Sequence, residues 1–360
     1  MLTQPHVFSE KLRPERSGRL AAACDIASRS IGIVFYDLEL RRRYARSVLV
    51  GETVTPLTAE RQLGRLLLTA QRELSIPASA IETVGAAASV AASAALEGLS
   101  AAELYLNPQT EIHIIPYISA GIGGRFTASL LTLPRSGFVA ADVGGDICLA
   151  ACSEDGGIVC AAFPLTGAFD GAALEGGMTG ERGAIDAVRR ESDGTLCYGV
   201  AGDCDGIGIS PCGAVCAAEI MLTQGIIDAD GILTDRDIFT IGEDIFISQA
   251  DVRFIQADKA RCRAALELFC ERAGARGGLY VSGEPFACAD GPRAMLRLGA
   301  LPDSFGGAGF CRSSAEQGII SFLESERSRT LAQEIVSKAQ DITQSLIADF
   351  DELYINNLLF

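Results

Sequence analysis

The turn Asp142-Val143-Gly144-Gly145-Asp146 has the clearest capacity for chemistry in this chain. One apolar run ends in the turn and a second leaves it, which is the pattern of two strands joined by a glycine hairpin. Glycines let a ligand approach the backbone closely, and the two carboxylates can hold a hydrated metal ion or a water molecule. The turn predicts a site for phosphate with Mg²⁺, and a plain hairpin is the equally weighted alternative.

A second acidic turn lies earlier in the chain. The strand expected over residues 20–24 runs into a small, hydroxyl-rich loop that begins at Asp25, and a strand expected over 31–36 follows it. Two matched acidic hairpins among mixed strands and helices indicate a duplicated α/β protein with a cleft between two lobes.

Histidine and cysteine usage narrows the possible chemistry. The two histidines leave almost no room for a His-based triad or a multi-histidine metal site. The twelve cysteines are expected to be reduced thiols, because we find no secretory signal. Four of them lie close together in the sequence, namely Cys197, Cys204, Cys212 and Cys216. Their spacing fits neither zinc pairs nor ferredoxin runs, so we expect packed core thiols, with metal binding as the minor alternative.

Net charge and apolar content argue against two classes of partner, nucleic acids and membranes. The formal net charge of −16 repels a phosphate backbone, and no basic stripe offsets it, so no nucleic-acid partner is expected. No run approaches the ~20 apolar residues of a membrane span, so no membrane partner is expected. The first twenty residues lack the apolar segment of a secretory signal, which favours a cytoplasmic location. A chain of 360 residues exceeds the usual limit of one core, so two lobes are expected.

The elements that must position the two turns follow from periodicity. Helices are expected over 58–74, 88–96, 118–131, 212–224, 248–271, 314–323, 327–336 and 346–353. Ser248 with Asp251 three positions later is the capping pattern of a helix N-terminus. Further strands are expected over 81–86, 113–116 and 278–283, with an extended piece near 339–342. Residues 171–190 are expected to be a loop that leads into a helix.

Four segments, in the same order along the chain, resemble the reductive activators of corrinoid proteins. They are GAFDGAALEGGMTGERGAID at 167–186, QGIIDADG at 224–231, ISQADVRFIQADKARCRAALELF at 247–269 and DFDELYINNLLF at 349–360. The acidic hairpins and a late glycine turn also resemble the acetate and sugar kinase, heat-shock chaperone and actin superfamily. The resemblance implies an α/β fold of two ribonuclease H-like lobes, with ATP in the interlobe cleft. It implies a polar N-terminal tail over 1–20, a first lobe over 21–136, a second over 137–323 and closing helices over 324–360.

The same resemblance implies a set of site residues. The residues expected to bind the nucleotide are Asp25, Ser28, Ser30, Gly144, Gly145, Gly283, Glu284 and Gly309. Asp142 is expected to be the catalytic residue that positions Mg²⁺ or the attacking water, because phosphoryl transfer relies mainly on positioning and charge neutralisation. Asp25 and Asp146 are expected to be further Mg²⁺ ligands.

The function implied is ATP-dependent activation of a corrinoid protein, in which inactive Co(II) is reduced to Co(I). The activators that this chain resembles carry an iron–sulfur domain, and we find no such cysteine pattern at either end of the sequence. We therefore expect no iron–sulfur cluster, and electrons from a separate redox protein. The resemblance also implies a homodimer.

Several departures from the family pattern keep other functions open. Ala27 replaces a preferred glycine and Arg29 stands among the hydroxyls of the first loop, while Glu284 and Phe286 occupy a turn that is richer in glycine in the activators. A negative charge and a bulky ring there oppose nucleotide binding. The second possibility is therefore a non-catalytic module that binds a corrinoid protein or methyltransferase. The third is a metal or redox protein that uses the cysteines from Cys197 to Cys216.

Overall fold

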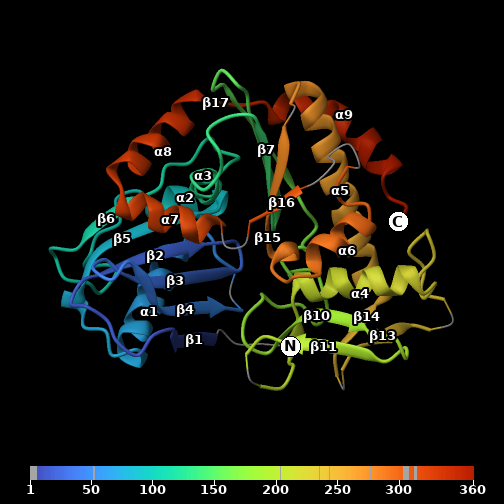
Figure 1. Cartoon of the computed structure of the whole chain (residues 1–360), viewed down its shortest axis with the longest axis horizontal. Coiled ribbons are helices and arrows are strands. Elements are labelled where there is room, and N and C mark those ends of the chain that lie inside the picture. The colour runs from blue at the N-terminus through green and yellow to red at the C-terminus, as the bar shows by residue number, and fades with distance from the viewer. Residues whose placement is uncertain are drawn as a thin grey trace. The chain divides into compact units, whose positions relative to one another are not determined.

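The structure is a computed structural model that describes residues 6–51, 53–202, 204–234, 236–242, 244–275, 277–302, 308–311 and 314–360. Contacts divide the chain into two compact lobes. The first lobe comprises residues up to 133 together with 314–339, and the second comprises residues 134–313 together with 340–360. Each lobe has a six-stranded sheet of its own (Figure 1).

The sheet of the first lobe has the strand order β1-β4-β3-β2-β5-β6. Its strands are β1 (His6–Lys11), β2 (Leu20–Ile26), β3 (Ser30–Asp37), β4 (Arg42–Val50), β5 (Ile81–Ala88) and β6 (Glu111–Ile114). Its helices are α1 (Ala59–Glu73), α2 (Val90–Ser93), α3 (Gly124–Leu130), α7 (Ser314–Glu324) and α8 (Glu326–Lys338). Strands β2 and β3 form an antiparallel hairpin, whereas β2, β5 and β6 run parallel.

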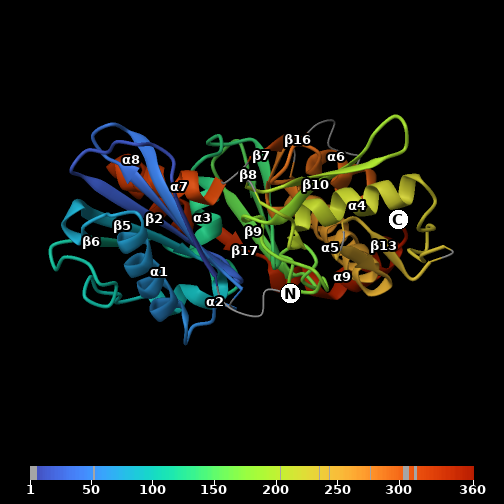
Figure 2. The same cartoon turned by 90° about the horizontal axis from the view of Figure 1, so that it is seen from below.

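Both faces of this first sheet are covered. Alternate residues of β2 point to opposite faces, as the two-residue period of a strand requires. Ala22 and Cys24 join the core cluster that includes α1, while Ala21 and Ala23 join the cluster that includes α7. Figure 2 shows α1 on one face and α3, α7 and α8 on the other. A strand buried on both faces explains why β2 is apolar almost throughout.

The sheet of the second lobe has the order β16-β15-β7-β8-β9-β17. Its strands are β7 (Phe138–Val143), β8 (Asp146–Cys152), β9 (Ile158–Pro164), β15 (Gly278–Gly283), β16 (Ala308–Phe310) and β17 (Ala339–Asp341). Smaller sheets consist of β10 (Ala184–Arg190), β11 (Leu196–Val200) and β12 (Gly208–Ile209), and of β13 (Ile238–Thr240) and β14 (Phe246–Ser248). The helices are α4 (Pro211–Thr223), α5 (Gln249–Ala273), α6 (Gly291–Arg297) and α9 (Thr343–Asn356).

Helix α5 is the central packing element of the second lobe. It packs against β8 and β9 of the sheet and against α4 and α9. The predicted capping box is confirmed, since Ser248 accepts from the Asp251 N–H while the Asp251 side chain accepts from the Ser248 N–H. The helix ends at Gly274 in the left-handed region, with φ of 58°, which is the usual glycine C-cap.

Most predicted elements are confirmed, and two expectations were wrong. Residues 184–190 form strand β10 instead of a helix, because they pair with β11 and bury Ile185 and Val188 against the core. The polar tail contains β1, which pairs residue by residue with β4. Pairing with β4 in the case of β1, and with the neighbouring β11 in the case of β10, outweighs the local pattern.

The lobe limits differ from the ranges expected from the sequence in one respect. Helix α7, which was expected to end the second lobe, clusters with the first lobe. It packs on β2 and β5, where a Cβ added at Gly85 would lie 2.8 Å from the Leu323 side chain. The first lobe is therefore formed by two segments of the chain, and most of the second lobe lies between them in sequence.

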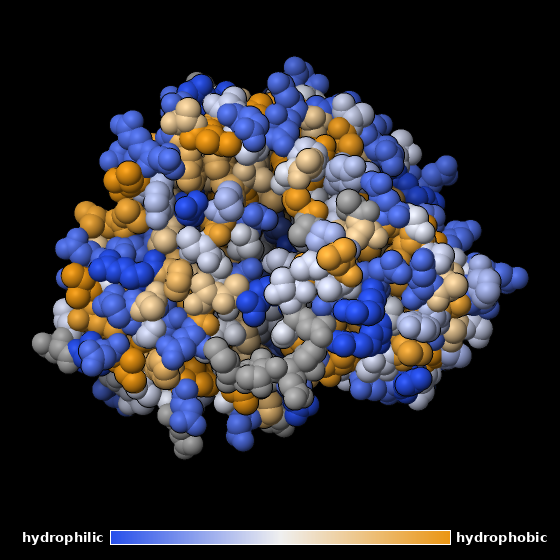
Figure 3. Space-filling model, turned by 180° about the vertical axis from the view of Figure 1, so that it is seen from behind, coloured by the Kyte–Doolittle hydropathy of each residue, from blue (hydrophilic) through white to orange (hydrophobic). Residues whose placement is uncertain are grey.

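No helix among the described residues is both long enough and apolar enough to cross a bilayer. On the face drawn in Figure 3, hydrophilic and hydrophobic side chains are interspersed.

Candidate functional site

The predicted Asp142 hairpin is present in the second lobe. Strands β7 and β8 pair up to Val143 and Ile147, and the Gly144 N–H donates to the Asp146 carbonyl at 2.9 Å. Asp142 is the last polar residue before the turn and is 7% exposed. The chain buries this carboxyl group at the end of a strand, where a charge requires partners.

Strand β15 supplies a partner for Asp142. It lies parallel to β7, with Ser282 opposite Asp142 and Gly283 opposite Val143. The Ser282 hydroxyl donates to Asp142 Oδ1 at 2.6 Å. The late glycine turn and the acidic hairpin, which are far apart in the sequence, therefore meet at one end of the sheet.

Gly283 and Gly144 differ in what an added side chain would meet. Gly283 has φ of 118°, and a Cβ there would lie 1.9 Å from the Val143 carbonyl oxygen. Backbone packing alone therefore requires glycine at this position. A Cβ at Gly144 would meet no described protein atom within 4 Å, and its φ lies outside the left-handed region. The protein leaves room beside Gly144 that its own packing does not need.

Asp146 begins β8 and is exposed as a whole residue. The surrounding protein nevertheless partly desolvates its carboxyl group, which raises its pKa, and the nearby carboxylate of Asp170 raises it further. Mg²⁺ is usually held by one or two carboxylates together with phosphate oxygens, so Asp142 and Asp146 are the donor types that this ion needs. A cation here would also relieve the repulsion between Asp146 and Asp170.

Asp258 holds the segment that leads to Asp170, a role that sequence reasoning missed. Its buried carboxylate accepts from the Thr166 hydroxyl at 2.7 Å, from the Ala168 N–H at 2.8 Å and from the Phe169 N–H at 3.2 Å, and also from the Thr166 N–H. About two turns earlier on the same helix, Asp251 accepts from the Glu175 N–H at 2.8 Å. Helix α5 therefore holds residues 166–175 in place through hydrogen bonds from the backbone N–H groups of that segment. The only sequence signal was two acidic residues seven positions apart on one helix.

Glu284 lies directly beside the Gly283 turn, whereas Gly309 lies further along the sheet. Glu284 begins the single turn η3 (Glu284–Phe286) directly after Gly283, and a Cβ at Gly180 would lie 3.5 Å from its Oε2 atom. Gly309 pairs with Tyr280, three positions before Gly283, so it lies further along the sheet from the hairpin. Phe286 is 2% exposed, and its ring centroid is 5.9 Å from that of Phe310. Its bulk is taken up by the core of the lobe.

In the first lobe, Asp25 is paired with a residue that the sequence analysis did not single out. The Arg125 Nε atom donates to Asp25 Oδ1 at 2.8 Å, and both side chains are largely buried. The hydroxyl-rich loop is a tight turn in which the Ala27 N–H donates to the Ser30 carbonyl, while the Ser28 carbonyl accepts from Val54. The Arg125 guanidinium therefore compensates the charge of Asp25 within the first lobe.

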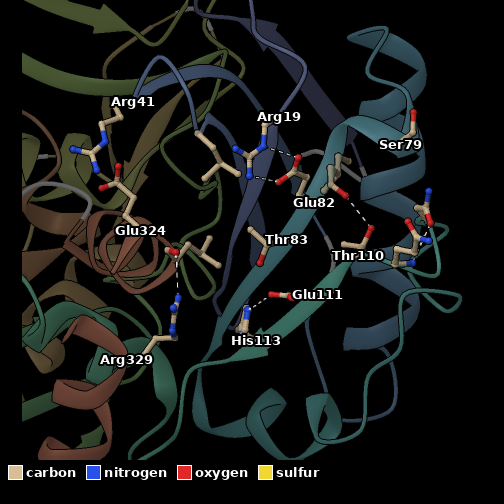
Figure 4. Close-up of a pocket in the computed structure, with 15 residues that line it drawn as sticks. Arg19, Arg41, Ser79, Glu82, Thr83, Thr110, Glu111, His113, Glu324 and Arg329 are labelled. Atoms are coloured by element: carbon tan, nitrogen blue, oxygen red, sulfur yellow. Dashed lines mark hydrogen bonds and ion pairs between the residues drawn. The ribbon is translucent and has the colours of Figure 1, made fainter. Parts of the chain in front are cut away.

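A polar recess elsewhere in the first lobe is unrelated to these residues. It has a volume of about 700 Å³ and is shown in Figure 4. Arg19 donates to both oxygens of Glu82 at 2.7 and 2.8 Å, and His113 Nε2 lies 3.5 Å from Glu111. Arg329 donates to backbone carbonyls. Arg19 and His113 of the recess thus contact acidic side chains, and Arg329 is held by backbone carbonyls.

The predicted cysteine group does not come together as four residues. Cys197 and Cys204 are exposed, while Cys212 and Cys216 are buried on α4. The latter two meet Cys288, which lies 72 residues further along the chain from Cys216. The three Sγ atoms lie within 4.8 Å of one another. In the parts of the chain that are described, groups of three or more side chains placed to share a metal ion occur here alone.

The chain has two lobes of sheet and helices, and each lobe contains an acidic hairpin. A glycine turn lies beside the hairpin of the second lobe. These features define the actin-like ATPase fold class, also called the ASKHA fold. A family model described as the C-terminal domain of RACo, the ASKHA domain, matches residues 139–360, which is more than half of the chain. The chain belongs to this family. The expected family and the expected two-lobed α/β fold are both confirmed.

Two relatives illustrate the likeness. The chain is 28% identical over 205 residues to the corrinoid activation enzyme RamQ of Eubacterium limosum, a match that covers 48% of this chain and 34% of that protein. It thus matches only about a third of the length of this curated relative. The solved structure of a reductive activator for a corrinoid, iron–sulfur protein matches with a TM-score of 0.80 and 17% identity, over 96% of this chain and 67% of that one. That structural likeness shows the fold.

Proposed function

We propose that this chain binds ATP with Mg²⁺ and activates a corrinoid protein, assisting the reduction of Co(II) to Co(I) with electrons from a separate redox protein. The observation that supports this most is the family match over 139–360, which includes the Asp142 hairpin and the Gly283 turn. RamQ is a corrinoid activation enzyme, and the solved structure is that of a reductive activator for a corrinoid, iron–sulfur protein. A homodimer and a cytoplasmic location complete the proposal.

The second-lobe geometry supports a nucleotide in particular. Space beside Gly144 would admit phosphate oxygens to the backbone of the hairpin. Asp142 and Asp146 would hold Mg²⁺, and that ion would supply charge neutralisation for the phosphates. Asp142 is oriented by Ser282, so the chain itself fixes the carboxylate on which positioning depends.

Residues of the first lobe belong to the same proposal. The hydroxyl groups of Ser28 and Ser30 would bind the phosphates, and Asp25, whose Oδ1 atom accepts from Arg125 Nε at 2.8 Å, would be a further ligand of Mg²⁺. Glu284 would lie toward the ribose, where its carboxylate can accept hydrogen bonds from hydroxyl groups.

The first experiment is calorimetric titration of the purified chain with ATP and Mg²⁺, repeated with Asp142→Ala and with Asp193→Ala. Asp193 is exposed in the β10–β11 turn and serves as the matched control. We expect the first substitution to weaken binding at least tenfold, about 1.4 kcal/mol, and the control to leave it unchanged. Absence of binding at millimolar ATP would refute the nucleotide part of the proposal.

The corrinoid part requires a second measurement. A corrinoid protein in the Co(II) state is mixed with the chain, a low-potential electron donor and ATP, and Co(I) is followed by its visible absorption. We expect Co(I) to form only when both the chain and ATP are present. Equal reduction with Asp142→Ala would separate any corrinoid role from nucleotide chemistry.

The Asp25–Arg125 ion pair favours one alternative, a binding module with a degenerate nucleotide site. Such a module would form a complex with a corrinoid protein or methyltransferase in the absence of ATP, and ATP would not change the affinity. Size-exclusion chromatography of the mixture with and without ATP distinguishes the two functions.

A further inference from the structure

Three cysteines of the second lobe form a compact thiol cluster, here called the thiol cluster: Cys212, Cys216 and Cys288. Cys212 lies in the first turn of α4, and Cys216 lies one turn later on the same face. Cys288 lies between η3 and α6, which pack against α4 (Figure 1). All three Sγ atoms lie within 4.8 Å of one another, and those of Cys216 and Cys288 are 3.9 Å apart.

This spacing matches that of metal-bound thiolates. Ligands at the Zn–S distance of about 2.3 Å on a tetrahedron lie about 3.8 Å apart, so small side-chain shifts would let one ion contact all three sulfurs. A disulfide would need two of these sulfurs at about 2.05 Å, which leaves the third without a role. The number of sulfurs in the cluster therefore favours a metal ion.

Backbone hydrogen bonds prepare the cluster for negative charge. The Cys288 N–H donates to Cys212 Sγ at 3.2 Å, and the Gly291 N–H donates to Cys288 Sγ at 3.2 Å. Gly291 has to be glycine, because a Cβ there would lie 2.2 Å from the Pro285 carbonyl oxygen and 2.7 Å from Cys212 Sγ.

We propose that Cys212, Cys216 and Cys288 bind a thiophilic metal ion of the Zn²⁺ type, with a fourth coordination position open to water or another exchangeable ligand. Three protein ligands plus one exchangeable position is an established zinc arrangement. A divalent ion suits the site better than Cu⁺, because three thiolates leave one excess negative charge on Zn²⁺ and two on Cu⁺ in a largely buried place. Cys288 is only partly buried, so the cluster has a route to the surface.

The site would connect two parts of the second lobe. Cys212 and Cys216 belong to α4, while Cys288 follows the turn that starts with Gly283 and Glu284. A bound ion would hold that turn against α4 and increase stability, since metal binding to the folded chain adds to folding free energy. The metal site is independent of whether the hairpin binds a nucleotide.

The test uses the full chain, purified under reducing, anaerobic conditions and stripped with a chelator. Zn²⁺ is titrated in competition with a chromophoric chelator, and Co²⁺ is added separately to detect thiolate-to-metal charge-transfer absorption. The variants are Cys216→Ser and, as the matched control, Cys204→Ser, which changes an exposed cysteine outside the cluster. We expect one Zn²⁺ per chain in the wild type and the control, with a higher thermal unfolding temperature when Zn²⁺ is bound.

In Cys216→Ser we expect the affinity for Zn²⁺ to fall by more than the roughly 10–100-fold that outer-shell changes cost, and the Co²⁺ band to weaken. Cys288→Ser, at the more accessible position, provides the same test if Cys216→Ser does not fold by circular dichroism. Unchanged Zn²⁺ affinity in the folded variant, or no stoichiometric binding by the reduced wild type, would overturn the proposal. So would a Cys216–Cys288 disulfide found by alkylation of the anaerobic protein.

Discussion

The hydroxyl of Ser282 donates to Oδ1 of Asp142 at 2.6 Å, between two parallel strands that lie 140 residues apart in the sequence. The contact is buried, so it orients a carboxylate that water cannot reach freely. It connects the acidic hairpin to the glycine turn that follows β15. Orientation of this one carboxylate therefore depends on a strand outside the hairpin itself.

Replacement of Ser282 by alanine should destabilise the chain and weaken ATP binding together. Asp142 would lose a buried hydrogen bond to a charged acceptor, which costs about 1–3 kcal/mol. Unfolding in denaturant measures the first effect, and calorimetry the second. Ser345→Ala, which changes an exposed serine of the same lobe, should shift stability by less than about 0.5 kcal/mol. A change in Ser282→Ala no larger than in this control would mean that the contact does not hold Asp142.

Two glycine substitutions should separate fold from function. Gly283→Ala should cost about 3 kcal/mol or more, because its Cβ would collide with the Val143 carbonyl at a φ that alanine rarely adopts. Gly144→Ala should change stability by less than about 1 kcal/mol, since its Cβ meets open space. If phosphate occupies that space, Gly144→Ala should still lower ATP affinity. Thermal unfolding and ATP titration of both variants check this, and full ATP affinity in Gly144→Ala would contradict it.

Asp258→Asn should loosen the segment that leads to Asp170. An amide nitrogen cannot accept hydrogen bonds, so one side of the residue would face N–H donors without an acceptor. We expect a loss of about 1–3 kcal/mol and faster hydrogen exchange at the Ala168 and Phe169 amides. Asp351→Asn, at an exposed position on α9, is the control. Unchanged exchange at both amides would show that the segment is held by other contacts.

Local pattern predicted the elements well wherever the element is stabilised locally. The hairpin at Asp142, the capping box at Ser248 and the helix over 211–223 all follow from turn glycines, caps and periodicity. The pattern failed at β1, because its partner β4 lies far along the chain and no short window of sequence contains both strands. It also failed at β10, although β10 forms a local hairpin with β11 and the Asp193-Gly194 pair in the turn was the available signal.

The candidate site divides in the same way. Asp142 and Gly283 could be singled out because each lies in a recognisable turn. Arg125 could not, because its partner Asp25 lies 100 residues away and nothing near Arg125 indicates an ion pair. The thiol cluster shows the same limit, since Cys288 joins Cys212 and Cys216 only through the packing of α6 on α4. Site residues that lie within one turn can be predicted from the sequence, whereas site residues that come from separate elements can be found only from the folded structure.

Replacement of Asp146 by asparagine should raise the stability of the chain and weaken its binding of ATP with Mg²⁺. Burial and the Asp170 carboxylate raise its pKa, so the folded chain retains a proton there at a pH where an unfolded aspartate is ionised. Its contribution to stability is complete below the ordinary carboxyl pKa of about 3.9 and is lost as the pH rises through the raised value. At neutral pH, Asp146→Asn should therefore be more stable than the wild type.

Binding of ATP with Mg²⁺ should respond in the reverse direction, because the ion needs the ionised carboxylate. Wild-type affinity should fall more steeply than that of Asp146→Asn as the pH is lowered from 7.5 to 5. Comparison with the variant at each pH cancels the protonation of ATP itself. At pH 7.5 the variant should bind more weakly despite its greater stability. If it binds equally well and its pH profile matches that of the wild type, Asp146 is not a ligand of the ion.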